Sequence, residues 1–136
     1  MVTAVDSSVL FDLLTGDPAY GPRSRRALEL CVMQGQVLAC EVVWAEVAAH
    51  FSTGAAARQM FTELGIEFSP LTQEAALEAG KAWRSYRARG GPRARVAPDF
   101  LIGAHAWLET DRLLTRDHGF YRSCFKRLTI LDPTSP

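Results

Sequence analysis

Short apolar runs alternate with longer segments of mixed polarity along this chain, and the alternation predicts its secondary structure. The short runs predict buried strands at 2–6, 37–40, 66–68, 112–115 and 128–131. The longer segments between them predict helices at 9–14, 23–34, 41–52, 55–64, 72–89 and 98–109. Strands that alternate with helices in this way predict an α/β fold, with a parallel sheet covered on both faces.

Capping and breaking residues mark the ends of several of these elements. Ser7 or Ser8 can cap the first helix, and Gly16 stops it. Residues 90–92 form a Gly-Gly-Pro loop, and Pro98 suits the first turn of the last predicted helix. In an open parallel sheet the ligand site lies at the carboxyl ends of the strands, so residues that follow strands are the first candidates for function.

The composition is that of one ordinary globular domain. Hydrophobic residues make up 48% of the 136 residues, so we expect a single domain over 1–136, with 132–136 as a flexible tail. No apolar run approaches the roughly 18 residues of a membrane span, and residues 1–6 do not resemble a signal peptide. Cys31, Cys40 and Cys124 are widely spaced, which predicts reduced thiols in a cytoplasmic protein without a membrane partner.

Positive charge is concentrated in one stretch, although the net charge is zero. Residues 80–98 contain no acid, and their basic residues are Lys81, Arg84, Arg87, Arg89, Arg93 and Arg95. Two explanations stay open, namely a solvated helix face and a strip that binds phosphate groups. The stretch immediately precedes Asp99. If the second explanation holds, the candidates for contact with a nucleic-acid backbone are Arg87, Arg89, Arg93 and Arg95.

Four carboxylates stand where a metal-binding pocket would need them. Asp6 ends the first predicted strand, and Asp117 closely follows the fourth. Glu46 lies in the apolar stretch 42–49, and Asp99 opens an apolar helix. Isolated carboxylates on buried faces are costly unless they are paired, protonated or bound to a cation. We therefore expect these four side chains to meet at one edge of the sheet.

Each carboxylate also has an ordinary explanation. Asp6 suits a turn or a helix cap, Asp99 suits the positive end of a helix dipole, and Asp117 suits a loop. Glu46 has a competitor in Glu41, which follows the second strand directly but has the usual place of an acid in a first helical turn. None of these explanations accounts for all four acids falling at one end of the predicted sheet, so we choose Glu46 as the fourth member.

Carboxylates that converge in this way point to a hard divalent cation. Several of them would have to be protonated without a cation, because like charges repel at short range. Mg²⁺ or Mn²⁺, as one or two ions, prefers such oxygen ligands and can orient a water, lower its pKa and offset charge on a leaving oxygen. Ser7 and Thr115 are candidates to orient the carboxylates or to contact phosphate, with a capping or strand-end role as the alternative.

Other kinds of site have weaker signals. The spacing of His50, His105 and His118 is not that of a zinc site, and His105 suits a hydrogen-bonded position in the core. The chain has no glycine-rich phosphate loop of the common types. A phosphoryl-transfer enzyme with Asp6 as nucleophile would want a further acid where the chain has Ser8, so this alternative has little support.

Four stretches together resemble the motifs of PIN-domain ribonucleases, and most of all those of VapC-type toxins of bacterial toxin–antitoxin pairs. The order and spacing of the motifs carry the resemblance, which runs from residue 2 to about 131. Their sequences are Val-Asp-Ser-Ser-Val-Leu at 5–10, Val-Trp-Ala-Glu-Val at 43–47, Asp-Phe-Leu-Ile-Gly-Ala-His-Ala at 99–106 and Leu-Thr-Arg-Asp-His-Gly-Phe at 114–120.

The resemblance implies a three-layer α/β/α sandwich around a central, mainly parallel five-stranded sheet. It implies an endoribonuclease dependent on Mg²⁺ or Mn²⁺ that cuts tRNA or rRNA, with Asp6, Glu46, Asp99 and Asp117 as the catalytic, metal-binding set. It also implies a cognate antitoxin that covers the acidic pocket, and a homodimer. The alternative is a non-catalytic PIN-like module that binds RNA for regulation.

Overall fold

A single parallel sheet forms the centre of the protein. The computed structural model describes residues 1–92, 95 and 97–135. Within these residues five strands pair in the order β3-β2-β1-β4-β5, and each pairing is parallel. The strands are β1 (Val2–Val5), β2 (Gln36–Ala39), β3 (Ile66–Phe68), β4 (Arg112–Leu114) and β5 (Ile130–Leu131). The predicted α/β class with a five-stranded parallel sheet is thus confirmed.

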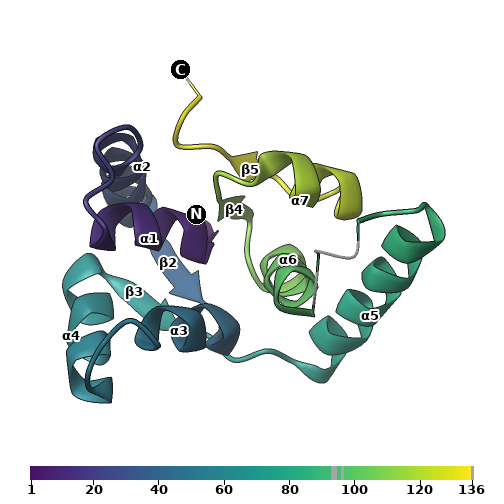
Figure 1. The fold of residues 1–136 in the computed structure, drawn as a ribbon, viewed down its shortest axis with the longest axis horizontal. Helices are drawn as coiled ribbons and strands as arrows, with labels where there is room; N and C mark the ends of the chain where they lie inside the picture. The colour runs from purple at the N-terminus through teal and green to yellow at the C-terminus, as the bar shows by residue number, and fades with distance from the viewer. Residues whose placement is uncertain (93–94, 96, 136) are drawn as a thin grey trace.

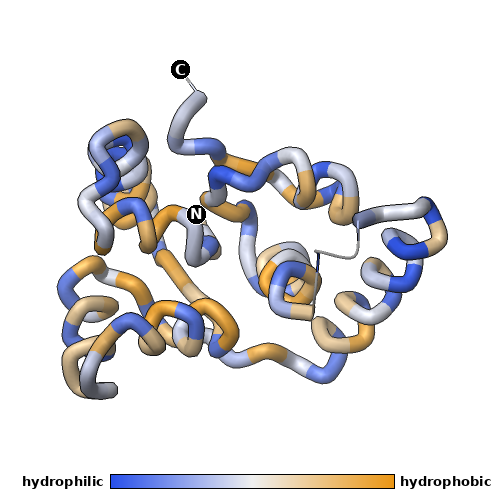
Figure 2. The backbone as a smooth tube through the Cα atoms, in the orientation of Figure 1, coloured by the Kyte–Doolittle hydropathy of each residue, from blue (hydrophilic) through white to orange (hydrophobic). Residues whose placement is uncertain are grey.

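Helices lie on both sides of the row of strands (Figure 1), which confirms the predicted three-layer arrangement. In the described part of the chain they are α1 (Ser7–Leu14), α2 (Gly21–Gln34), α3 (Glu41–Ala48), α4 (Gly54–Leu64), α5 (Gln73–Ala88), α6 (Ala97–Glu109) and α7 (His118–Cys124). None of these helices is both long enough and apolar enough to cross a membrane. The strands are largely apolar, and hydrophilic residues gather toward the C-terminal end of α5 (Figure 2).

The position of β1 in the sheet decides where a site can form. The chain leaves β1 for β2 on one side, and it returns through β4 on the other side. The order of the strands therefore reverses at β1, and ligand sites of open α/β sheets lie at such a point, beyond the carboxyl ends of the strands. Asp6 follows β1, and Thr115 follows β4, its neighbour in the sheet.

Helix α7 is not among the helices predicted from the sequence, which assigned no element to residues 116–127. The helix has only seven residues, too few for a helical period to show in the sequence, and helices this short depend on tertiary packing. Phe120 supplies that packing, because its ring lies 5.2 Å from that of Phe100 and 5.8 Å from that of Tyr86. Tyr121, beside it, is 1% exposed.

Several predicted boundaries also differ from those observed. The helix predicted over 41–52 ends at Ala48, and the strand predicted over 128–131 is reduced to Ile130–Leu131 at the edge of the sheet. The region predicted as a flexible tail begins with a packed residue, because Asp132 is 9% exposed. Its carboxylate accepts hydrogen bonds from the backbone N–H of Thr134 at 2.8 Å and from its hydroxyl at 2.6 Å.

Candidate active site

Asp6 lies at the carboxyl end of the central strand and is 5% exposed. Its carboxylate accepts hydrogen bonds from the hydroxyls of Thr115 at 2.7 Å, Ser8 at 3.2 Å and Ser7 at 3.5 Å. Burial raises the pKa of Asp6 above its ordinary value, the hydrogen bonds oppose that rise, and the charge of Asp117 adds to it. Asp6 is therefore a carboxylate whose ionised form is costly in the absence of a cation.

Ser7 connects Asp6 to Glu46. The Ser7 hydroxyl lies 3.2 Å from Oε1 of Glu46, on α3, and within hydrogen-bonding distance of Asp6. Burial raises the pKa of Glu46, the Ser7 hydrogen bond lowers it, and the charges of Asp6 and Asp99 raise it again. Glu41 lies elsewhere, where its Oε1 accepts the backbone N–H of Leu71 at 2.8 Å. The structure therefore places Glu46, and not Glu41, in the carboxylate group.

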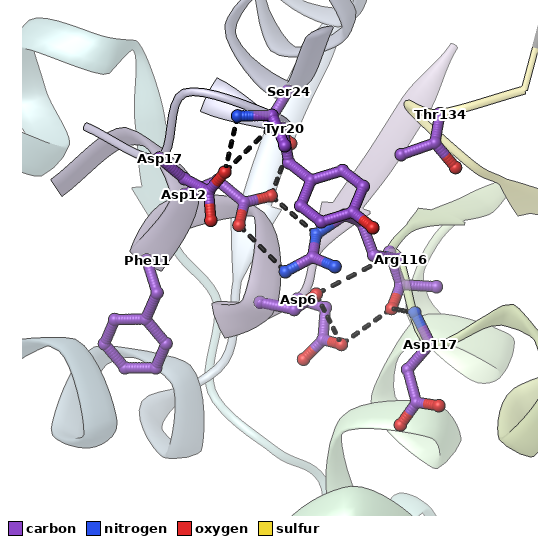
Figure 3. Close-up of polar contacts among 12 residues, drawn as sticks. Asp6, Phe11, Asp12, Asp17, Tyr20, Ser24, Arg116, Asp117 and Thr134 are labelled. Atoms are coloured by element: carbon purple, nitrogen blue, oxygen red, sulfur yellow. Dashed lines mark hydrogen bonds and ion pairs between the residues drawn. The ribbon is translucent and has the colours of Figure 1, made fainter. Parts of the chain in front are cut away.

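Thr115 connects Asp6 to Asp117. Its hydroxyl donates to Asp6 and accepts the backbone N–H of Asp117 at 2.9 Å. Because Thr115 is fully buried, this hydroxyl holds the first residues after β4 against the end of β1. The side chains of Asp6 and Asp117 point to the same side in the close-up (Figure 3).

Arg95 connects Asp117 to Asp99. Its guanidinium donates to both carboxylate oxygens of Asp117, and its Nη1 also lies 3.8 Å from Oδ2 of Asp99 in the first turn of α6. The hydrogen bond to Asp117 raises the pKa of Arg95 further above its already high value, so this side chain is a permanent cation. All three side chains are about one-third exposed, so solvent screens the two ion pairs.

The four predicted carboxylates thus belong to one connected group although they come from four separate parts of the chain. Ser7, Thr115 and Arg95 are the three links between them. Tyr121 of α7 is buried within electrostatic range of all four carboxylates. Burial raises the pKa of its hydroxyl well above the ordinary value, and the charges of Asp6, Asp99, Asp117 and Glu46 add to that rise. The structure brings together every carboxylate that the sequence predicted.

The chemistry of this group fits a hard divalent ion, but the side chains are not arranged as a finished metal site. The atoms of this group that could bind a metal are carboxylate and hydroxyl oxygens, the ligands that Mg²⁺ and Mn²⁺ prefer. Among the residues described, no three His, Cys, Asp or Glu side chains stand close enough to hold a metal. Arg95 is the cation between Asp117 and Asp99 in this arrangement, so a metal ion bound by these carboxylates would have to compete with it.

A second polar group, which was not predicted from the sequence, holds the loop that carries Thr115 and Asp117. Asp12 of α1 is 3% exposed and accepts hydrogen bonds from Arg116 at 2.7 and 2.9 Å and from Ser24 at 2.7 Å. These contacts attach Arg116 to α1, and Ser24 joins the same carboxylate to α2 (Figure 3). The available signal was the same as for Glu46, since Asp12 is a lone acid in the apolar run 9–14.

The arginines predicted to contact a nucleic-acid backbone have different surroundings. The Arg87 guanidinium lies 4.5 Å from the centroid of the Trp83 ring, on the same helix. Arg89 donates to the hydroxyl of Ser123 at 3.4 Å, on α7, whereas Arg95 is bound within the carboxylate group. Arg93 lies outside the described residues.

The three histidines lie apart from one another. His105 is 1% exposed, and its Nε2 lies 2.9 Å from the Ser69 hydroxyl, so the prediction of a hydrogen-bonded core histidine is confirmed. His50 packs edge-on against Phe11, with ring centroids 4.8 Å apart. The Nε2 atom of His118 lies 3.4 Å from Oδ2 of Asp132, which is not one of the four carboxylates.

Comparison with known proteins identifies the family. The PIN domain family model matches residues 3–126, so the chain belongs to the PIN domain family, as the four motifs indicated. No curated protein sequence matches the chain.

Solved structures show the same fold over nearly the whole chain. VapBC2 from Rickettsia felis, bound to a DNA fragment from its promoter, has 16% identity and a TM-score of 0.75, over 97% of this chain and 98% of that one. VapBC-1 from nontypeable Haemophilus influenzae has 17% identity and a TM-score of 0.74, over 99% and 100%. A toxin–antitoxin complex from Klebsiella pneumoniae has 20% identity and a TM-score of 0.70, over 98% and 99%. At these identities the likeness is one of fold, and it agrees with the VapC-type resemblance.

Proposed function

We propose that this protein is a metal-dependent endoribonuclease and the toxin of a toxin–antitoxin pair. Membership of the PIN domain family supports a nuclease, and likeness in fold to VapBC complexes supports a toxin. The observation that carries the proposal is the connected group of four carboxylates at the reversal point of the sheet. An acidic group of this kind repels a phosphodiester unless cations bind first, so hydrolysis of RNA there requires Mg²⁺ or Mn²⁺.

Each residue has a distinct part in the proposed reaction. Asp6, Glu46, Asp99 and Asp117 are the oxygen ligands for one or two ions. Bound Mg²⁺ or Mn²⁺ would lower the pKa of an attacking water and offset the charge that develops on the leaving oxygen. The Ser7 and Thr115 hydroxyls orient the carboxylates, because each donates to Asp6 while it also contacts a neighbouring member of the group.

The proposal includes a cognate antitoxin and a cytoplasmic location, where the tRNA or rRNA substrate is found. An antitoxin that inhibits this site has to cover an acidic pocket, so we expect it to place a basic side chain near Asp117 and Asp99. Arg95 already forms that kind of contact within the chain. Whether the protein also forms a homodimer is a separate part of the proposal, which a size measurement of the purified protein tests.

Cleavage of RNA by the purified protein is the direct test. We expect a mixed-sequence RNA to be cut in Mg²⁺ or Mn²⁺ and left intact in excess EDTA. Asp6→Asn, Asp99→Asn and Glu46→Gln are each expected to lower the cleavage rate by about 100-fold or more, because each removes a charge that the ions need. Cleavage is followed as the loss of full-length labelled RNA on a denaturing gel.

Glu41→Gln is the matched control for Glu46→Gln, since both residues lie on α3 and the glutamine can still accept the backbone N–H of Leu71. Its cleavage rate should stay within about threefold of wild type. Equal rates in wild type and all three acid variants, or cleavage that persists in EDTA, would contradict the proposal. RNA that binds but is never shortened, with or without metal, would establish the alternative of a non-catalytic RNA-binding module.

A further inference from the structure

A cavity of about 760 Å³ lies beside the carboxylate group and has a different chemical character. Its described lining comprises Trp83, Tyr86 and Arg87 of α5, the loop Gly90–Pro92, and Arg95. This lining has two aromatic rings and two arginines but no acid. Arg95 belongs to both places, because it lines the cavity and also donates to Asp117. A ligand in the cavity therefore lies next to the proposed catalytic carboxylates.

The wall of the cavity is held in place by the backbone and by close packing. Gly90 donates its N–H to the carbonyl of Arg87 at 3.0 Å, and Gly91 donates to that of Tyr86 at 2.9 Å. A Cβ on Gly91 would lie 2.4 Å from the Tyr86 ring, so only glycine allows the loop to approach this closely. Tyr86 in turn packs against Phe100 and Phe120, with centroids 5.5 and 5.8 Å apart.

Arg87 is the cation that this cavity offers to a ligand. The charge of Arg95 is largely offset by Asp117 and Asp99, whereas the described contact of Arg87 is with a ring. The guanidinium of Arg87 lies over Trp83, whose ring is stacked on Phe100 at 5.6 Å with an interplanar angle of 15°. An arginine held on an aromatic face keeps its N–H groups free for acceptors, and less side-chain entropy is lost when it binds a phosphate.

Proteins bind single-stranded nucleic acid by stacking its bases on aromatic rings or on arginine guanidinium planes and by contacting its phosphates. Because Arg87 covers the Trp83 ring and Tyr86 is buried, the guanidinium plane of Arg87 is the stacking surface that the cavity offers. A duplex fits this description poorly, because its bases are already stacked on one another. We propose that this cavity binds a nucleotide of single-stranded RNA next to the phosphodiester that is cut, with Arg87 contacting the phosphate or base and Trp83 holding Arg87 in place. This inference rests on the proposed function and names its substrate site.

Binding to RNA in the absence of metal tests the inference separately from cleavage. The probe is a fluorescently labelled 12-nucleotide single-stranded RNA, and anisotropy is measured in EDTA over a series of KCl concentrations. Arg87→Ala is expected to weaken binding on the order of threefold to tenfold, and to reduce the slope of log Kd against log [KCl] by about 0.7, as the loss of one phosphate contact requires. Trp83→Phe, which retains a ring of smaller area, should weaken binding less than Arg87→Ala does.

Arg84→Ala is the matched control, because Arg84 is an exposed arginine on the same helix that does not line the cavity. We expect its affinity and salt slope to stay close to those of wild type. Identical effects of Arg84→Ala and Arg87→Ala would overturn the inference, since they would mean a diffuse attraction to positive charge. It would also be overturned if wild type bound no single-stranded RNA at low salt, or bound duplex RNA with the same dependence on Arg87.

The two proposals fail in different ways. If RNA is cut but Arg87→Ala binds and cuts it like wild type, the substrate site is elsewhere and the nuclease stands. If binding depends on Arg87 but no RNA is cut in any metal, the cavity is a nucleic-acid site and the proposed enzymatic function is wrong.

Discussion

At the residue scale, the same sequence signal led to two different kinds of acid. Asp6 and Asp12 both follow or interrupt apolar residues near the N-terminus, and both are buried, at 5% and 3% exposure. Asp12 is matched by an arginine in a two-point ion pair, whereas Asp6 accepts hydrogen bonds from hydroxyls and from the Ser7 backbone and lies near a further acid, Asp117. A buried acid therefore indicates a functional site only when its partners leave its charge unbalanced.

Arg95 gives a prediction at this scale. Because its guanidinium lies between Asp117 and Asp99, a divalent ion that binds these acids has to compete with a resident cation. We expect Arg95→Gln to bind Mn²⁺ about three- to tenfold more tightly than wild type, a modest gain because the ion pairs are partly solvated. Isothermal titration calorimetry with MnCl₂ alone measures this, without RNA and without any cleavage.

Arg89→Gln is the control for general charge, since Arg89 bonds to Ser123 and not to the acids. Its Mn²⁺ affinity should match that of wild type. Weaker Mn²⁺ binding by Arg95→Gln would show that Arg95 supports the metal site and does not compete with it.

At the element scale, one ion pair attaches the junction of β4 and α7 to Asp12 of α1, which Ser24 in turn joins to α2. Arg116 lies between Thr115 and Asp117 in the chain, and its side chain binds Asp12 (Figure 3). The Thr115 hydroxyl instead donates to Asp6 and accepts the backbone N–H of Asp117. The guanidinium also lies 4.1 Å from the centroid of the Tyr20 ring. The junction that presents Asp117 is therefore positioned from outside the carboxylate group.

We expect Arg116→Ala to lower the free energy of unfolding by about 2 kcal/mol, because it leaves the buried Asp12 carboxylate with Ser24 as its main partner. In a double-mutant cycle with Asp12→Ala, the coupling should be on the order of 1–3 kcal/mol. Urea unfolding of the four proteins measures both quantities.

The exposed pair Gln59 and Glu63 of α4 is a control for this cycle, with an expected coupling below about 0.5 kcal/mol. Arg116→Ala should also slow cleavage, because Asp117 loses its fixed position. A coupling near zero between Asp12 and Arg116 would mean that the junction holds its shape without this pair.

At the scale of the whole molecule, the carboxylate group links stability to pH and to metal. Burial raises the pKa of Asp6 and of Glu46 in the folded state. Over the range between the ordinary pKa and the raised one, the folded protein binds more protons than the unfolded chain. Stability therefore falls as pH rises through that range. Compared with Asp6→Asn, the metal-free wild type should lose stability as the pH rises above about 4, the ordinary pKa of an aspartate.

The metal part of this prediction is measured at neutral pH. Mn²⁺ at about 100 times its Kd should stabilise the wild type by about 2.7 kcal/mol, and Asp6→Asn by much less. Thermal melts with and without Mn²⁺, at several pH values, compare the two proteins. A constant difference between wild type and Asp6→Asn at all pH values would show that Asp6 ionises in the folded protein as readily as in the unfolded chain.

The sequence alone determined where the strands and most of the helices lie along the chain, because short apolar runs and the longer segments between them differ in length and composition. It also placed Asp6 and Thr115 correctly at strand ends, and it favoured Glu46 over Glu41. These features are local, since each depends on the pattern of residues within a short stretch of the chain.

Only the tertiary structure decided which polar groups meet. Arg116 binds Asp12, and Arg95 joins Asp117 to Asp99. Helix α7 is stabilised by the packing of Phe120 against Phe100 and Tyr86. These contacts join residues that are far apart in the chain or depend on packing between elements, so no local sequence pattern predicts them. The tertiary structure also decides whether the charge of a buried acid is balanced, because the partners of that acid come from other elements that the folded sheet places beside it.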